Sequence, residues 1–139
     1  MPTGDPVITV QDLAVGYDDR AILEHVSFDV REGEVFVMLG GSGSGKSTLL
    51  KHMIGLYPPI SGHVLIQGRD ITEADGDERR DILRGVGVMY QSGALFGSMT
   101  LAENVRLPLE EYTLLPRAAI DLIARMKLEL VGLDQFSGH

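Results

Sequence analysis

The chain has 139 residues, of which 44% are hydrophobic and 23% charged, a composition that fits one folded domain and not a disordered segment. Its 12 Lys and Arg face 20 Asp and Glu, and the resulting net charge of -8 argues against nucleic acid as a partner. The absence of cysteine excludes disulfides, a Cys-based zinc site and a thiol nucleophile, and no apolar run is long enough to predict a membrane-spanning helix.

The first part of the chain predicts short antiparallel strands. Alternating apolar residues predict a strand over about 7–13, and a second apolar stretch over 22–30 predicts its hairpin partner. Turns are predicted at 16–19 and 31–34, where Gly and Asp or Glu cluster. The unbroken apolar run at 35–39 then predicts a strand covered on both faces.

A glycine-rich loop follows this apolar run. Residues 40–47 match the pattern G-x-x-x-x-G-K-[ST], in which glycines let successive N–H groups face an anion at a helix N-terminus. We therefore predict that Lys46 reaches the β- and γ-phosphates of a nucleotide, that Ser47 binds Mg²⁺, and that Thr48 helps to hold the α- and β-phosphates. A flexible Gly/Ser linker is disfavoured because strand and helix patterns flank the loop. The predicted phosphate-binding residues are Gly40, Gly41, Ser42, Gly43, Ser44, Gly45, Lys46, Ser47 and Thr48.

After the glycine-rich loop, the chain is predicted to alternate between helices and strands. A helix is predicted over 46–56, with Leu49, Leu50 and Met53 at helical spacing, followed by a strand over 62–67. The charged stretch 70–81 predicts a solvated loop running into a helix, and 86–90 is another short apolar run of strand type. A capping box is predicted at 100–103. A helix with Pro116 near its start and Gly132 at its stop is predicted from one apolar face, formed by Ala119, Leu122, Ile123, Met126 and Leu130. The order of elements predicts an α/β domain with a β-rich N-terminal lobe.

Two further residues carry a resemblance to a known family. Tyr17 lies at the tip of the predicted hairpin, and Gln91 follows the apolar run at 86–90. Together with the loop, and over essentially all of residues 6–134, they resemble the nucleotide-binding subunits of ATP-binding cassette (ABC) transporters. The resemblance implies that Tyr17 stacks on the adenine of ATP, and that Gln91 contacts Mg²⁺ and the attacking water. Lys46 and Gln91 are then the expected catalytic residues of an ATPase.

The same resemblance implies a P-loop NTPase fold with a RecA-like core and an antiparallel β lobe. The lobe is expected over about 6–34, the core over about 35–91, and the start of a helical subdomain over about 92–134. It also implies a homodimer of nucleotide-binding subunits, lying at the inner face of the bacterial cytoplasmic membrane, and a transmembrane permease that contacts residues 91–99. The alternative for Leu95, Phe96 and Met99 is that they fold into the local core.

A finer resemblance lies in residues 91–109. These residues are similar to the ATPases of the lipid-trafficking (Mla-type) systems that keep the Gram-negative outer membrane asymmetric. The similarity implies phospholipid as the cargo and an Mce-type lipid-binding protein as a further partner.

The family's signature sequence, its Asp-Glu strand and its switch histidine do not occur in these 139 residues, and Phe136-Ser137-Gly138-His139 is not the signature. We therefore expect the N-terminal part of a longer ATPase, with a fold incomplete at its C-terminus and little hydrolysis by itself. The alternatives are a non-hydrolysing nucleotide-binding regulatory module and a soluble P-loop kinase or GTPase. A GTPase is disfavoured because no Asn-Lys-x-Asp motif occurs, and a kinase would leave Tyr17 and Gln91 without a task.

Overall fold

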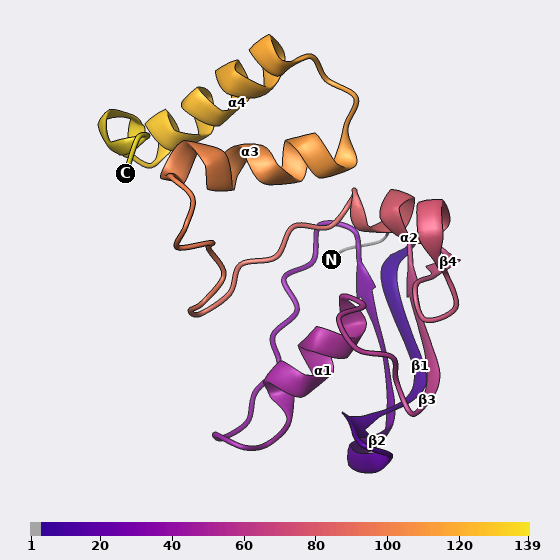
Figure 1. Ribbon diagram of the computed structural model, residues 1–139. Helices are drawn as coiled ribbons and strands as arrows, with labels where there is room; N and C mark the ends of the chain where they lie inside the picture. The colour runs from indigo at the N-terminus through magenta and orange to yellow at the C-terminus, as the bar shows by residue number, and fades with distance from the viewer. Residues whose placement is uncertain (1–3) are drawn as a thin grey trace. The chain divides into compact units, whose positions relative to one another are not determined.

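The computed structural model describes residues 4–139, which belong to two compact units that divide between Val86 and Gly87 (Figure 1). The first unit contains an antiparallel sheet of four strands in the order β2-β1-β3-β4. The strands are β1 (Pro6–Tyr17), β2 (Arg20–Arg31), β3 (Ser61–Ile66) and β4 (Arg69–Asp70). The predicted strand over 62–67 is therefore confirmed to within one residue at each end.

The predicted hairpin and its first turn are also confirmed. Tyr17 pairs with Arg20, so the loop between β1 and β2 has two residues. Both of these, Asp18 and Asp19, have left-handed φ angles of 50° and 59°. A two-residue turn of this kind matches the twist of the paired strands, and Asp tolerates the left-handed region better than most residues.

Helix α1 (Lys46–Met53) packs on the sheet and ends three residues before the predicted boundary. The stop is a Schellman motif, in which the Leu56 amide donates to the Lys51 carbonyl and the Gly55 amide to the His52 carbonyl. Gly55 has a φ of 77°, which glycine adopts without steric cost. Gly55 therefore ends the helix before the chain reaches Pro58 and Pro59.

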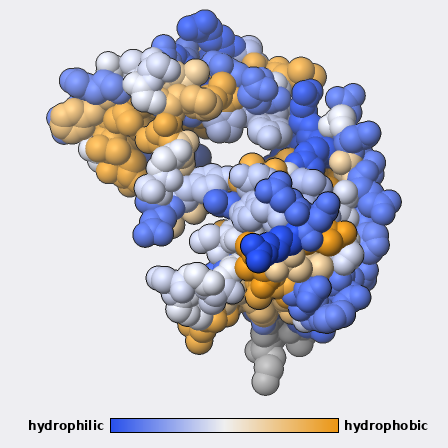
Figure 2. Space-filling model, turned by 60° about the horizontal axis from the view of Figure 1, so that its bottom comes forward, coloured by the Kyte–Doolittle hydropathy of each residue, from blue (hydrophilic) through white to orange (hydrophobic). Residues whose placement is uncertain are grey.

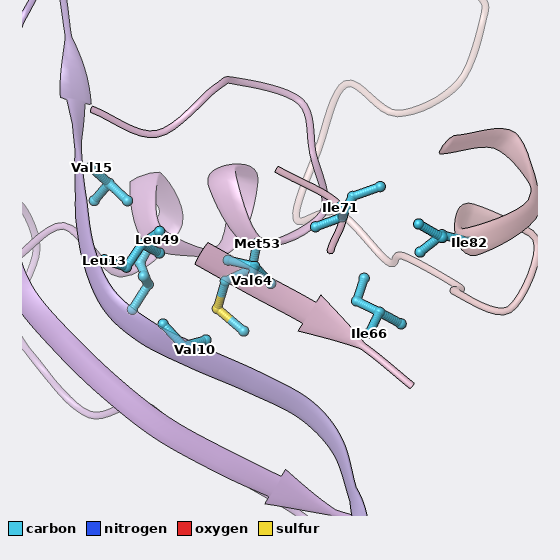
Figure 3. Packing of buried hydrophobic residues seen from close by; sticks show 9 residues of the cluster. All are labelled: Val10, Leu13, Val15, Leu49, Met53, Val64, Ile66, Ile71 and Ile82. Carbon is cyan, nitrogen blue, oxygen red and sulfur yellow. The ribbon is translucent and has the colours of Figure 1, made fainter. Parts of the chain in front are cut away.

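The core of the first unit lies between the sheet and its helices (Figure 3). Leu49 and Met53 point from α1 toward β1 and β3, and Ile82 comes from α2 (Gly76–Leu83). Helix α2 begins within the charged stretch where a loop was predicted to run into a helix. The nine buried residues of this core are Val10, Leu13, Val15, Leu49, Met53, Val64, Ile66, Ile71 and Ile82.

The predicted strand at 35–39 is wrong, because these residues belong to no strand. In this segment Phe36 stacks on Phe28 at a ring-centroid distance of 4.7 Å, while Val35 and Leu39 are 89% and 90% exposed. A strand needs neighbouring backbone to pair with, and the sheet formed within residues 4–139 offers this segment none. The strand expected at 86–90 is wrong for the same reason.

The second unit contains a pair of packed helices, α3 (Leu101–Tyr112) and α4 (Arg117–Leu130), followed by a short 3₁₀ helix, η1 (Asp134–Phe136). Arg106 of α3 donates to Asp121 of α4 over 3.0 Å. The predicted capping box is confirmed: the Glu103 amide donates to the Thr100 hydroxyl over 3.2 Å, and the Thr100 amide donates to the Glu103 carboxylate over 2.7 Å.

The predicted apolar face of α4 is only partly correct. The buried residues are Ile120, Ala124 and Leu128, which follow one another at intervals of four, and the predicted Ala119 and Ile123 are half-buried beside them. The other predicted members are exposed: Leu122, Met126 and Leu130. The packing against α3 therefore selects a neighbouring stripe of the helix, and part of its apolar surface faces outward.

Apolar and polar side chains share the surface of the molecule. Figure 2 shows the apolar ones gathered in patches between hydrophilic regions on the face in view. None of the helices within residues 4–139 is both long enough and apolar enough to span a bilayer.

Candidate nucleotide-binding site

The predicted phosphate-binding loop leads directly into the N-terminus of α1. Gly45 is the N-cap residue, with a left-handed φ of 95°, and the Leu49 amide closes the first helical turn onto the Gly45 carbonyl over 2.8 Å. The backbone amides of the first helical turn have no acceptor within the helix. They point toward the loop, where they can donate to a ligand. Residues 40–44 are exposed, which leaves this positive helix end open to an anion.

The side chain of Lys46 folds back across the loop. Its Nζ atom donates to the Gly40 carbonyl and, over 3.4 Å, to the Gly41 carbonyl. The Ser44 amide donates to the Gly41 carbonyl over 3.2 Å, so the loop curls around the ammonium group. This places a cation and a curled backbone together at the helix N-terminus, which suits a phosphate chain.

Two glycines of the loop lie close to other side chains. A Cβ atom at Gly40 would lie 2.6 Å from the Ser44 hydroxyl, and one at Gly45 would lie 3.1 Å from the side chains of Ile22 and Leu23. The second contact shows that the start of β2 lies against the end of the loop. The hairpin and the loop are therefore parts of one packed frame.

Tyr17 lies at the tip of this hairpin, within the same unit as the loop. Its ring is 38% exposed and packs against the rings of His52 and Tyr57, at centroid distances of 5.9 Å and 5.2 Å. A side chain at Gly16 would overlap the Arg20 carbonyl, so the turn beside Tyr17 depends on a glycine. Tyr17 thus packs against two other rings, and the exposed part of the residue is accessible to a ligand.

His52 is a residue of this frame that the sequence reasoning missed. It is only 1% exposed, whereas Leu50, which was assigned to the apolar face of the helix, is 41% exposed. The signal available in the sequence was a histidine four residues after Thr48, on the helix that leaves the loop. Helical spacing places such a side chain over the preceding turn.

Ser47 and Thr48 occupy the first turn of α1, as predicted, with Ser47 exposed and Thr48 half-buried. A hydroxyl at this position is a hard oxygen ligand of the kind that Mg²⁺ accepts alongside nucleotide phosphates. The loop, the Lys46 ammonium and the Ser47 hydroxyl together therefore fit a magnesium-bound triphosphate. Gln91 belongs to the second unit, where it is exposed, and its role stays a prediction.

The side chain of Asn104 hydrogen-bonds the backbone of residues 96–100, which overlap the predicted permease contact at 91–99. The Asn104 amide group accepts from the Phe96 amide over 2.8 Å and donates to the carbonyls of Phe96, Met99 and Thr100. Leu95 and Phe96 are 66% and 56% exposed, so these two side chains do not fold into the local core.

A polar cluster lies on β3, on β4 and on the segment after β4. Asp70 accepts from the Thr72 amide over 2.9 Å and lies 2.7 Å from Nδ1 of His63, with Glu73 at 3.8 Å from the same nitrogen. Burial raises the pKa of Asp70, but the hydrogen bonds from Thr72 and the proximity of His63 outweigh it, and the pKa is lowered overall. His63, Asp70 and Glu73 could hold a metal ion by their spacing, although their present contacts are with one another.

Comparison with known proteins agrees with this geometry. Residues 23–138 match the ABC transporter family, and the chain belongs to that family. The chain is 45% identical over 133 residues to a protein of Mycobacterium leprae named "Probable ribonucleotide transport ATP-binding protein mkl". It is 38% identical over 127 residues to the "Intermembrane phospholipid transport system ATP-binding protein MlaF" of Haemophilus influenzae.

Among solved structures, the chain resembles the ATP-binding cassette MJ0796, in a dimer bound to ADP and Pi, with a TM-score of 0.84 and 28% identity. The predicted P-loop fold with its antiparallel β sheet is thereby confirmed. The similarity covers 95% of this chain and 60% of that one. The match to the M. leprae relative covers 96% of this chain and 38% of that protein. The match to the H. influenzae relative covers 91% of this chain and 48% of that protein.

Proposed function

We propose that this chain binds ATP with Mg²⁺ as part of an ABC transporter ATPase, in which binding and hydrolysis drive transport. The observation that carries the proposal is the curled loop of residues 40–47 at the N-terminus of α1, packed in one unit with the half-exposed Tyr17 ring. One end of this frame suits phosphates and the other suits a base.

Each part of the frame has a role in this proposal. The loop amides and the Lys46 ammonium would bind the phosphate oxygens. Ser47 would hold the metal ion, and Gln91 would be a further ligand, as the family resemblance implies. Tyr17 stacks on adenine, a contact that any base can make because each has a π-face. When bound, Mg²⁺ neutralises charge on the β- and γ-phosphates, and in the complete site Lys46 and Gln91 stabilise and orient the reacting groups.

The partners follow from the same family. We propose a dimer of nucleotide-binding subunits, supported by the dimeric form of MJ0796, and a permease that receives Leu95 and Phe96. The protein would then lie at the inner face of the cytoplasmic membrane. We also propose that the β lobe covers about residues 6–34, the core about 35–91 and the helical subdomain about 92–134. The exposed apolar pair on a clamped loop supports the permease contact.

For the cargo we propose a phospholipid, with an Mce-type lipid-binding protein as a further partner. The support is the similarity to the H. influenzae protein named for phospholipid transport. The relative from M. leprae is named for ribonucleotide transport, so the two names mark the alternatives that a transport assay would distinguish.

The test of the central proposal is Lys46→Ala in the full-length protein, with ATP binding measured by calorimetry in the presence of Mg²⁺. Removing a charge-assisted hydrogen bond to phosphate should weaken ATP binding by about tenfold or more. Lys51→Ala is the matched control, because Lys51 lies on the same helix but outside the loop. Equal affinities of the two variants for ATP would refute the assignment of the loop.

A further inference from the structure

Among residues 4–139, His52 is the polar residue that is buried. Its Nδ1 atom lies 2.7 Å from the Thr48 carbonyl, and its Nε2 atom lies 3.2 Å from the Gly16 carbonyl. The first contact is local, within one turn of α1. The second reaches across to β1, thirty-six positions earlier in the chain.

These two carbonyls belong to the two ends of the proposed ATP site. Thr48 is the last residue of the phosphate-binding stretch, and Gly16 immediately precedes Tyr17. A carbonyl oxygen only accepts hydrogen bonds, and a neutral imidazole carries a single N–H, so each tautomer of His52 donates to one carbonyl: from Nε2 to Gly16 or from Nδ1 to Thr48. With the hydrogen on Nε2, His52 ties the helix that carries the phosphate-binding loop to the backbone beside the base-binding ring.

The ring of His52 also supports Tyr17 directly. Tyr17, His52 and Tyr57 form a cluster of three rings, with Tyr57 meeting Tyr17 edge-on at 89° and lying 5.7 Å from His52. Edge-to-face pairs at such distances are favourable. Tyr17 packs in this cluster and is still 38% exposed, so part of the residue remains accessible.

We propose that His52 is a positioning residue for adenine recognition: it fixes the Tyr17 ring at a set distance from the phosphate-binding loop. This inference rests on the proposed ATP-binding function. A histidine that merely filled the core would affect stability without distinguishing the base from the phosphates. A positioning histidine affects affinity for ATP and leaves affinity for a bare phosphate chain unchanged.

Two amide substitutions separate the contact with Gly16 from the contact with Thr48. The side-chain nitrogen of Asn can replace Nδ1 and reach Thr48, whereas the longer Gln can replace Nε2 and reach Gly16. His52→Gln should therefore preserve the link to the base-binding turn, and His52→Asn should lose it. His52→Leu removes both ring nitrogens and puts an apolar side chain in their place.

The measurement is the affinity of the full-length protein and its variants for ATP and for tripolyphosphate, both with Mg²⁺. His52→Asn and His52→Leu should bind ATP about twofold to tenfold more weakly than the parent, with tripolyphosphate binding unchanged and His52→Gln close to the parent. If His52→Leu fails to fold, as a urea titration would reveal, the comparison of Asn with Gln still decides the question. Equal ATP affinity in the Asn and Gln variants overturns the inference.

A double-mutant cycle with Tyr17→Ala completes the test. Once the Tyr17 ring is absent, His52→Asn should have no further effect on ATP affinity, because the histidine acts through that ring. Additive losses would overturn the inference while leaving the proposed function intact. If the parent protein binds neither ATP nor tripolyphosphate, the proposed function itself fails.

Discussion

Alanine substitutions at three glycines of the phosphate-binding loop should differ sharply in their effect on stability. Gly45 has a φ of 95°, and an added Cβ would meet Ile22 and Leu23 at 3.1 Å. Gly43 has a φ of 79° with open space around it, and Gly41 has neither a left-handed φ nor a close neighbour. The three positions thus separate backbone strain from crowding within one loop.

The expected magnitudes follow from these two terms. A left-handed conformation costs a non-glycine residue about 1–2 kcal/mol, whereas replacing glycine by alanine stabilises by about 0.4–1 kcal/mol through the unfolded chain. Gly41→Ala should therefore be neutral or slightly stabilising, and Gly43→Ala should destabilise by up to about 1.5 kcal/mol. Crowding adds about 1–3 kcal/mol, so Gly45→Ala should destabilise by about 1–4 kcal/mol.

The assay is urea unfolding of the full-length protein and the three variants, followed by circular dichroism at one temperature and pH. The expected order of unfolding free energies is Gly41→Ala highest, Gly43→Ala next and Gly45→Ala lowest. If Gly45→Ala were as stable as Gly43→Ala, the contact between the loop and the start of β2 would be wrong. Triphosphate binding, measured on the same samples, should fall most for Gly45→Ala, because this residue caps the helix at the anion site.

Two further predictions concern hydrogen bonds outside the loop. Thr100→Ala removes the hydroxyl that caps α3 and should lower the unfolding free energy by about 0.5–2 kcal/mol, whereas Thr100→Ser should retain most of it; equal losses in both variants would contradict the capping role. Asp70→Asn should reduce stability at pH 7, because the folded protein lowers the pKa of this carboxyl. The contribution of the Asp70 carboxylate is fully present above its ordinary pKa of 3.8 and is lost as the pH falls through the lower folded value, so urea midpoints of parent and variant should converge in acid. A constant gap between the two midpoints from pH 7 to pH 3 would contradict this account.

The sequence by itself determined the features that depend on local physics. The loop pattern at 40–47, the hairpin turn at Asp18 and Asp19, and the capping box at Thr100 all involve residues close together in the chain. Glycine conformational freedom and side-chain capping act over a few residues, so the sequence pattern alone is enough to predict them.

The tertiary structure decided which apolar runs become strands and which helical stripe is buried. The run at 35–39 has the composition of a buried strand, but a strand exists only where neighbouring backbone pairs with it. Helix α4 carries a broad apolar surface, and its contact with α3 selects Ile120, Ala124 and Leu128 from it. The link from His52 to Gly16 joins residues thirty-six positions apart, a distance over which sequence periodicity carries no information. Such contacts are determined by the packing of the whole unit, because many side chains must fit together at once before any one of them has a fixed partner.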